Sequence, residues 1–159
     1  MSETQHLTRD IGQAERAMRA LLEAQLREAD LAFPEWTVLV HLDGAGPLTA
    51  AQLVQRQLAG RVVAEESAAR GTVDRLRSAG LLGPVGEGDG TDGGARDGAT
   101  SQLAPTEAGG AVYRRLRRAV SRITDELYGD LPPADLEATQ RTLTELTRRA
   151  NARLTDSTS

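Results

Sequence analysis

All 19 Lys or Arg residues of this sequence are arginine and none is lysine. Arginine is therefore the side chain with which the chain can bind an anionic partner. The guanidinium group makes planar, bidentate contacts to phosphate and to guanine. Five arginines and no acid lie between residues 113 and 124, at positions 114, 115, 117, 118 and 122. Residues 86–98 show the opposite bias, with Glu87, Asp89, Asp92 and Asp97 against Arg96. The net charge of −4 is not typical of a nucleic-acid binder, but the segregation of charge matters more than its sum.

Several other kinds of chemistry are excluded by composition. The chain has no cysteine, which rules out disulfides, zinc-thiolate sites and thiol redox sensing. His6 and His41 are far apart and form no nucleophile-base arrangement, so we expect no enzyme, no catalytic residue, no metal and no cofactor. The glycine-rich stretch lacks the GK[ST] ending of a phosphate-binding loop. No apolar run approaches the roughly 20 residues of a membrane span, and we expect a cytoplasmic protein with no membrane partner.

The first half of the chain has the periodicity of helices. Aliphatic residues dominate the apolar composition, which favours helices over a β-sandwich. An apolar stripe predicts a long helix over 5–29, and "FPEW" at 33–36 opens a second helix that should be largely buried. "DGAGP" at 43–47 is predicted to be a turn. Thr49 and Gln52 have capping-box spacing for a short helix over 49–58, and a fourth helix is expected over 63–79, ending at Gly80.

The second half begins with a hairpin and ends with two long helices. "LLGPV" from residue 81 predicts a short strand, and a weak return strand is expected near 100–104. Between them lie glycines at 83, 86, 88, 90, 93, 94 and 98. Thr106 is placed to cap a fifth helix, whose apolar residues form a seam of the coiled-coil kind: Tyr113, Leu116, Val120, Ile123 and Leu127. A sixth helix should run to about Leu154.

The apolar stripes of the outer helices need a large partner surface. We expect the outer helices of two chains to cover one another in a homodimer, although an intramolecular bundle would also bury these stripes. Three helices followed by a two-stranded hairpin are the winged helix-turn-helix arrangement, in which the second helix of the pair enters the major groove of DNA. That pair would be 49–58 and 63–79.

Several segments of the sequence together resemble the MarR family of bacterial transcriptional regulators. The resemblance is carried by "FPEWTVLVHL", "GPLTAAQL" and "VDRLRSAGLL", and by the spacing of Asp97, Leu103, Thr106 and Gly109. It implies a mainly α fold with a small β-hairpin wing, in one domain over 1–159. Within that domain, 34–105 would be the winged helix-turn-helix core, and 5–30 and 106–154 the helical dimerisation region. It also implies a homodimer that binds double-stranded operator DNA and releases it when a small-molecule effector binds.

The sequence departs from the family pattern at three points. The turn before the recognition helix is enlarged around "AGRVV". Ala99 stands where the family has a wing arginine, so we expect Arg96 to substitute for it. Pro105 replaces an apolar residue, and we expect it to weaken the return strand because proline cannot donate to a strand ladder. The acidic stretch 86–98 should repel phosphates and contribute little to affinity for DNA.

Two groups of candidate binding residues follow from the resemblance. Ser67 and Arg70 are placed to contact base edges, since arginine to guanine is the commonest specific contact. Arg56, Arg61 and Arg75, together with Arg96 of the wing, are candidates for phosphate contacts, although each would also serve as a solvated surface charge. Trp36 and His41 lie on the helix that borders the family's ligand pocket. A core role for Trp36 and a half-buried, hydrogen-bonded role for His41 are the commoner outcomes.

The function indicated is a sequence-specific DNA-binding transcriptional regulator, expected to be a ligand-responsive repressor. A second class stays open, a winged-helix module that binds proteins and has lost DNA binding. The acids of the wing favour the second class. Salt-dependent binding to DNA would distinguish the two.

Overall fold

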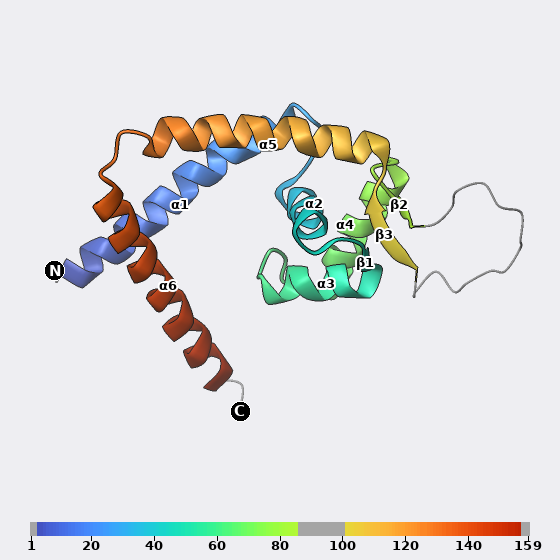
Figure 1. The fold of residues 1–159 in the computed structure, drawn as a ribbon. Helices are drawn as coiled ribbons and strands as arrows, with labels where there is room; N and C mark the ends of the chain where they lie inside the picture. Colours follow the sequence, from blue (N-terminus) through green and yellow to red (C-terminus); the bar gives the residue numbers. More distant parts are fainter. Residues whose placement is uncertain (1–2, 86–100, 157–159) are drawn as a thin grey trace, which may run out of the picture. The chain divides into compact units, whose positions relative to one another are not determined.

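The computed structural model describes residues 3–85 and 101–156, and the side chains of all of these except 3–5 (Figure 1). The chain divides into two compact units, Met1–Val120 and Ser121–Ser159. Helix α5 (Glu107–Tyr128) crosses from the first unit into the second. None of the described helices is long and apolar enough to cross a membrane.

Three helices of the first unit pack on one another: α2 (Phe33–Ala45), α3 (Ala50–Ala59) and α4 (Glu66–Ser78). They lie beside the small sheet in Figure 1. The predicted capping box starts α3, because the Thr49 hydroxyl accepts from the Gln52 amide at 3.2 Å and the Gln52 side chain accepts from the Thr49 amide at 2.9 Å. Two of the amide groups that the start of a helix leaves without intrahelical partners are thereby satisfied. The predicted order of helices is confirmed here.

The end of α2 corrects one sequence prediction. The predicted turn at 43–47 starts too early, because Asp43, Gly44 and Ala45 still belong to the helix. The chain leaves the helix at Gly46, which has φ of +76° and donates its amide to the Leu42 carbonyl at 2.9 Å. A glycine at this position tolerates the positive φ with which the chain leaves the helix. The composition of the segment was right for a turn, but the turn begins at Gly46 and not at Asp43.

The sheet has three strands where the sequence predicted two. Strand β3 (Gln102–Pro105) pairs in antiparallel fashion with β2 (Leu82–Pro84) on one side and with β1 (Leu48–Thr49) on the other. Leu48 lies opposite Leu103, and both side chains are buried. A two-residue strand shows no alternation in sequence, so only its partner reveals it.

We expected Pro105 to weaken the return strand, but it does not. It is the last residue of β3 and lies opposite Leu82. The adjoining backbone bonds run from the Val85 amide to the Gln102 carbonyl and from the Thr106 amide to the Leu81 carbonyl, at 2.8 and 3.0 Å. In this antiparallel pattern Pro105 occupies a non-hydrogen-bonded position, so its missing N–H removes no bond to β2.

The core of the first unit joins the three-helix group to α1 (Glu3–Arg27), the sheet and the first half of α5. Leu26, Leu39, Leu53 and Leu76 are its largest apolar side chains with at most 1% of their surface exposed. Leu116 is also part of this core, with 3% of its surface exposed. The sequence prediction placed Leu116 on a seam of α5 that would face a second chain, and this prediction is wrong. In the first half of α5, the seam packs into the core of the first unit.

The second unit contains the end of α5 and α6 (Pro133–Asp156). No residue of α6 is buried. Its exposed apolar side chains include Leu143, Leu146 and Leu154. Within this unit a shallow cavity of about 510 Å³ is lined by Tyr128, Leu136, Leu143 and four polar residues of α6. The apolar stripe predicted for the last helix is therefore present and largely uncovered by the second unit itself.

Candidate nucleic-acid interface

Helix α4 has one buried side and one exposed side. The buried side consists of Ala69, Thr72, Val73 and Leu76, which pack into the core of the first unit with α2 and α3. Ser67 and Arg70 are on the exposed surface, as the sequence predicted. The N-terminal half of a helix in this position is the part that contacts base edges in helix-turn-helix proteins.

The turn that leads into α4 is longer than the three or four residues typical of a helix-turn-helix motif. It spans residues 60–65, so α4 begins at Glu66 and not at 63 as predicted. Val62 and Val63 are partly buried, and the Val62 amide donates to the Gln57 carbonyl at 2.9 Å. Arg61 takes a left-handed conformation, with φ of +51°. These features keep residues 60–65 in a compact turn. Helical periodicity alone does not reveal this turn and therefore predicted an earlier start for α4.

Each candidate base-contacting residue has an acidic neighbour. Two guanidinium nitrogens of Arg70, Nε and Nη2, donate to Oε1 of Glu66, which lies one helical turn earlier. The Ser67 hydroxyl donates to Oε2 of Glu65 at 3.4 Å. Both pairs are exposed. The side chains expected to face DNA are thus presented together with carboxylates.

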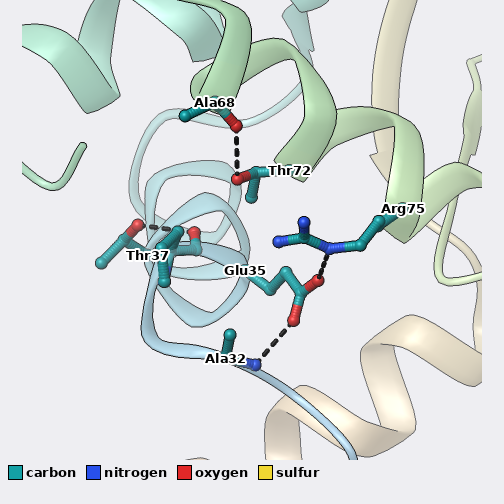
Figure 2. A network of polar contacts seen from close by, with 7 residues as sticks. Ala32, Glu35, Thr37, Ala68, Thr72 and Arg75 are labelled. Atoms are coloured by element: carbon teal, nitrogen blue, oxygen red, sulfur yellow. Dashed lines mark hydrogen bonds and ion pairs between the residues drawn. The ribbon is translucent and has the colours of Figure 1, made fainter. Parts of the chain in front are cut away.

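Arg75 links α4 to α2 (Figure 2). Its Nε donates to Oε1 of Glu35 at 2.6 Å, and Oε2 of Glu35 accepts from the Ala32 amide at 2.6 Å. The Glu35 side chain is 9% exposed, whereas that of Arg75 is 60% exposed. The ion pair therefore holds a nearly buried carboxylate and fixes α4 against the start of α2. Sequence reasoning did not identify Glu35, although its position three residues after Ala32 at the start of a helix is a capping signal.

A cavity of about 530 Å³ lies next to this ion pair. Its lining comes from the α1–α2 connection, α2, α4, the segment after α4, and Val112 of α5. The charged residues of the lining are Asp30, Glu35, Asp74 and Arg75. Three carboxylates against one guanidinium give this cavity a negative balance.

The structure places Trp36 and His41 differently. Trp36 is part of the core and stacks on Tyr113, with ring centroids 5.3 Å apart and planes at 29°. His41 is partly buried, and its Nε2 has no hydrogen-bond partner within the described residues. Burial lowers the pKa of His41, and the positive charge of Arg56 lowers that pKa further. The lowered pKa favours the uncharged imidazole, the form that has no positive charge for an anionic ligand.

A second polar contact that the sequence did not reveal joins α2 to α5. Oδ2 of Asp43 accepts from the Tyr113 hydroxyl at 2.9 Å and from Nη1 of Arg117 at 2.7 Å. Burial raises the pKa of Tyr113, and its hydrogen bond to Asp43 adds to that effect. Arg117 belongs to the arginine-rich run, so at least this member of the run has a structural role.

The remaining candidates divide into exposed residues and one whose position the structure does not describe. Arg56 and Arg61 are exposed, at the end of α3 and in the turn after it. Arg96 and the acidic stretch 86–98 lie outside the described residues. No group of three potential metal ligands occurs in the part of the chain that the structure describes.

Comparison with protein-family models gave no match, and comparison with curated protein sequences gave no significant match. Solved structures do match. Staphylococcus aureus MarR in complex with salicylate and kanamycin is 16% identical, with a TM-score of 0.77 over 94% of this chain and 93% of that chain. A MarR family protein from Bacillus stearothermophilus is 17% identical, with a TM-score of 0.68 over 95% and 99%. Bordetella bronchiseptica BpsR, whose DNA binding is regulated by 6-hydroxynicotinic acid, is 19% identical, with a TM-score of 0.63 over 92% and 94%.

These identities are low, so the likeness concerns the three-dimensional arrangement. The helix pair α3–α4, the hairpin β2–β3 and the long helices α1, α5 and α6 occur in the order that the resemblance predicted, and β1 adds a third strand to the sheet. This chain therefore has the winged helix-turn-helix fold of the MarR family of transcriptional regulators.

Proposed function

We propose that this chain is a homodimeric, DNA-binding transcriptional repressor that responds to a small molecule. The observation that carries the proposal is the position of α4, whose buried side completes the helix-turn-helix core while Ser67 and Arg70 stay exposed. A helix presented in this way fits the major groove, and its arginine can donate to guanine O6 and N7. Arg56 and Arg61, on the preceding helix and turn, supply charge for phosphates.

Arg70→Ala is the direct test of this proposal. We expect the variant to bind a duplex from the promoter of its own gene more weakly by about 1–3 kcal/mol, because one bidentate base contact is lost. Binding to a scrambled duplex should change little. Fluorescence anisotropy at several salt concentrations measures both affinities and the number of phosphate contacts.

Arg141→Ala is the matched control, because Arg141 also forms an exposed ion pair with a glutamate four residues earlier but belongs to α6. It should leave both affinities unchanged. An equal loss on both duplexes for Arg70→Ala would identify Arg70 as a phosphate contact. Wild-type protein that binds neither duplex at low salt would favour the protein-interaction module, a function that the acids beside Arg70 and Ser67 also suit.

The homodimer is supported by the surface of α6. A helix with no buried residue and several exposed leucines presents an apolar surface that single chains rarely leave to solvent. Leu7, Met18 and Leu21 of α1 are likewise exposed. We infer that a second copy of the chain covers these side chains.

The cavity beside Arg75 is the proposed effector site. A molecule bound there would contact both members of the Glu35–Arg75 pair and so change how α4 is held against α2. The negative balance of the lining favours a cationic effector over a carboxylate such as salicylate. Of the two ligands named for the Staphylococcus aureus protein, kanamycin carries amino groups and salicylate a carboxylate.

A thermal-shift experiment tests the effector site, because a ligand that binds only the folded state raises Tm. We expect kanamycin to raise Tm by about 5–10 °C at about 100 times its Kd, and salicylate at equal concentration to have no effect. Asp74→Asn should reduce the response. Asp135→Asn, at the start of α6, removes a carboxylate outside the cavity and should preserve it. A rise in Tm with salicylate but not with kanamycin would contradict the proposal that the cavity prefers a cationic effector.

A further inference from the structure

We infer that Glu66 is a specificity-determining residue, and that it accepts a hydrogen bond from the N4 amino group of a cytosine next to the guanine that Arg70 contacts. The inference rests on the proposed function and deepens it, because it assigns a base to an acidic side chain of the recognition helix. Its first support is position. Glu66 is the first residue of α4 and is exposed, and side chains at the start of a recognition helix are those that contact base edges.

The second support is the pairing of Glu66 with Arg70. Both donors of Arg70 end on Oε1, and a carboxylate has about four lone-pair sites, so Oε2 can accept from a further donor. The two side chains are four residues apart, a rise of about 6 Å along the helix. They can therefore contact two adjoining base pairs as one unit, with the ion pair holding each side chain in place.

Three of the other exposed residues of α4 face a cavity. Asp74, Arg75 and Ser78 line the cavity toward the α1–α2 connection and α5. The strip formed by Glu66, Arg70 and Arg77 borders neither this cavity nor the other described ones. Glu66, Ser67 and Arg70, in the first turns of α4, are thus left for contact with bases.

The chemistry of the major groove then selects the base. A carboxylate can only accept, and the donors in the groove are the amino groups of cytosine and adenine. Adenine also presents its N7 acceptor, which repels a carboxylate, whereas cytosine presents its amino group alone. Without such a donor, Glu66 would oppose binding by its proximity to phosphates. A cytosine at this position would donate a hydrogen bond from its N4 amino group to the Glu66 carboxylate, and so offset the repulsion by phosphates.

The experiment is selection of bound duplexes from a random-sequence pool, followed by sequencing, with wild-type protein, Glu66→Gln and Glu66→Ala. The wild type should enrich a motif in which a cytosine lies next to a guanine. That guanine is the one that Arg70 contacts, so the Arg70→Ala variant should lose the preference for it. Glu66→Ala should lose the preference for that cytosine by about 5- to 100-fold, the discrimination of one good base contact. Glu66→Gln should change the preferred base to adenine, because glutamine both donates to N7 and accepts from the amino group.

Glu137→Gln is the matched control, since Glu137 forms the exposed i,i+4 pair with Arg141 outside α4. Its motif should equal that of the wild type. A motif that stays unchanged in both Glu66 variants, while their circular dichroism and Tm match the wild type, overturns the role of Glu66 and leaves the regulator intact. A wild-type selection that enriches no motif overturns the proposed function itself. The two failures are therefore distinct.

Discussion

Replacing Gly109 with alanine should destabilise the first unit by about 1–3 kcal/mol, although alanine is the better helix former. A Cβ atom at Gly109 would collide with the carbonyl oxygen of Leu81. That oxygen cannot easily move, because it accepts from the Thr106 amide at 3.0 Å. Thr106 in turn caps α5 by accepting from the Gly109 amide at 3.1 Å, and it donates to the Gly80 carbonyl at 2.6 Å. The close approach of α5 to the segment before β2 therefore depends on glycine.

The neighbouring residue Gly110 supplies the control. A Cβ atom there meets only the guanidinium of Arg114, the far end of a flexible side chain, at 3.1 Å. Gly110→Ala should therefore stabilise α5 by up to about 1 kcal/mol. Urea unfolding followed by the fluorescence of Trp36, the one tryptophan of the chain, measures both variants. If Gly109→Ala is as stable as Gly110→Ala, the close packing against Leu81 is not required.

Leu143→Asp should convert the proposed homodimer into monomers. Leu143 is 40% exposed on α6 and lines the shallow apolar cavity together with Tyr128 and Leu136. A charge introduced here would be buried against a second chain without a partner, at a cost of several kcal/mol. Sedimentation velocity at micromolar concentration measures the change of mass. Because the side chain is exposed within its own unit, the monomer should keep its helical content.

Ala138→Asp places the same charge on the opposite side of α6, five residues earlier. Ala138 is exposed and does not line the cavity, so this variant should stay dimeric. Leu116→Asp would not be informative, because Leu116 belongs to the core and its replacement would unfold the first unit. A wild-type chain that sediments as a monomer would contradict the homodimer and favour an intramolecular covering of α6.

Local signals in the sequence were enough to predict most elements of the fold. The capping box at Thr49 and Gln52, Gly80 after α4 and Thr106 before α5 each act within a few residues, so the chain segment itself carries the information. The exposure of Ser67 and Arg70 also followed from periodicity, because a helix with one apolar side must present its other side to solvent. The roles of these residues toward DNA stay predictions.

The sequence by itself determined the helices, their order and the charged side of α4, since caps and helical periodicity are local properties. Only the tertiary structure decided which groups meet across the chain. Strand β1 forms because Leu48 pairs with Leu103 of β3, and Arg75 forms an ion pair with Glu35, 40 residues earlier. Leu116 is a core residue because α5 packs on the first unit before it reaches the second. These outcomes depend on contacts between residues distant in sequence, which neither composition nor spacing encodes.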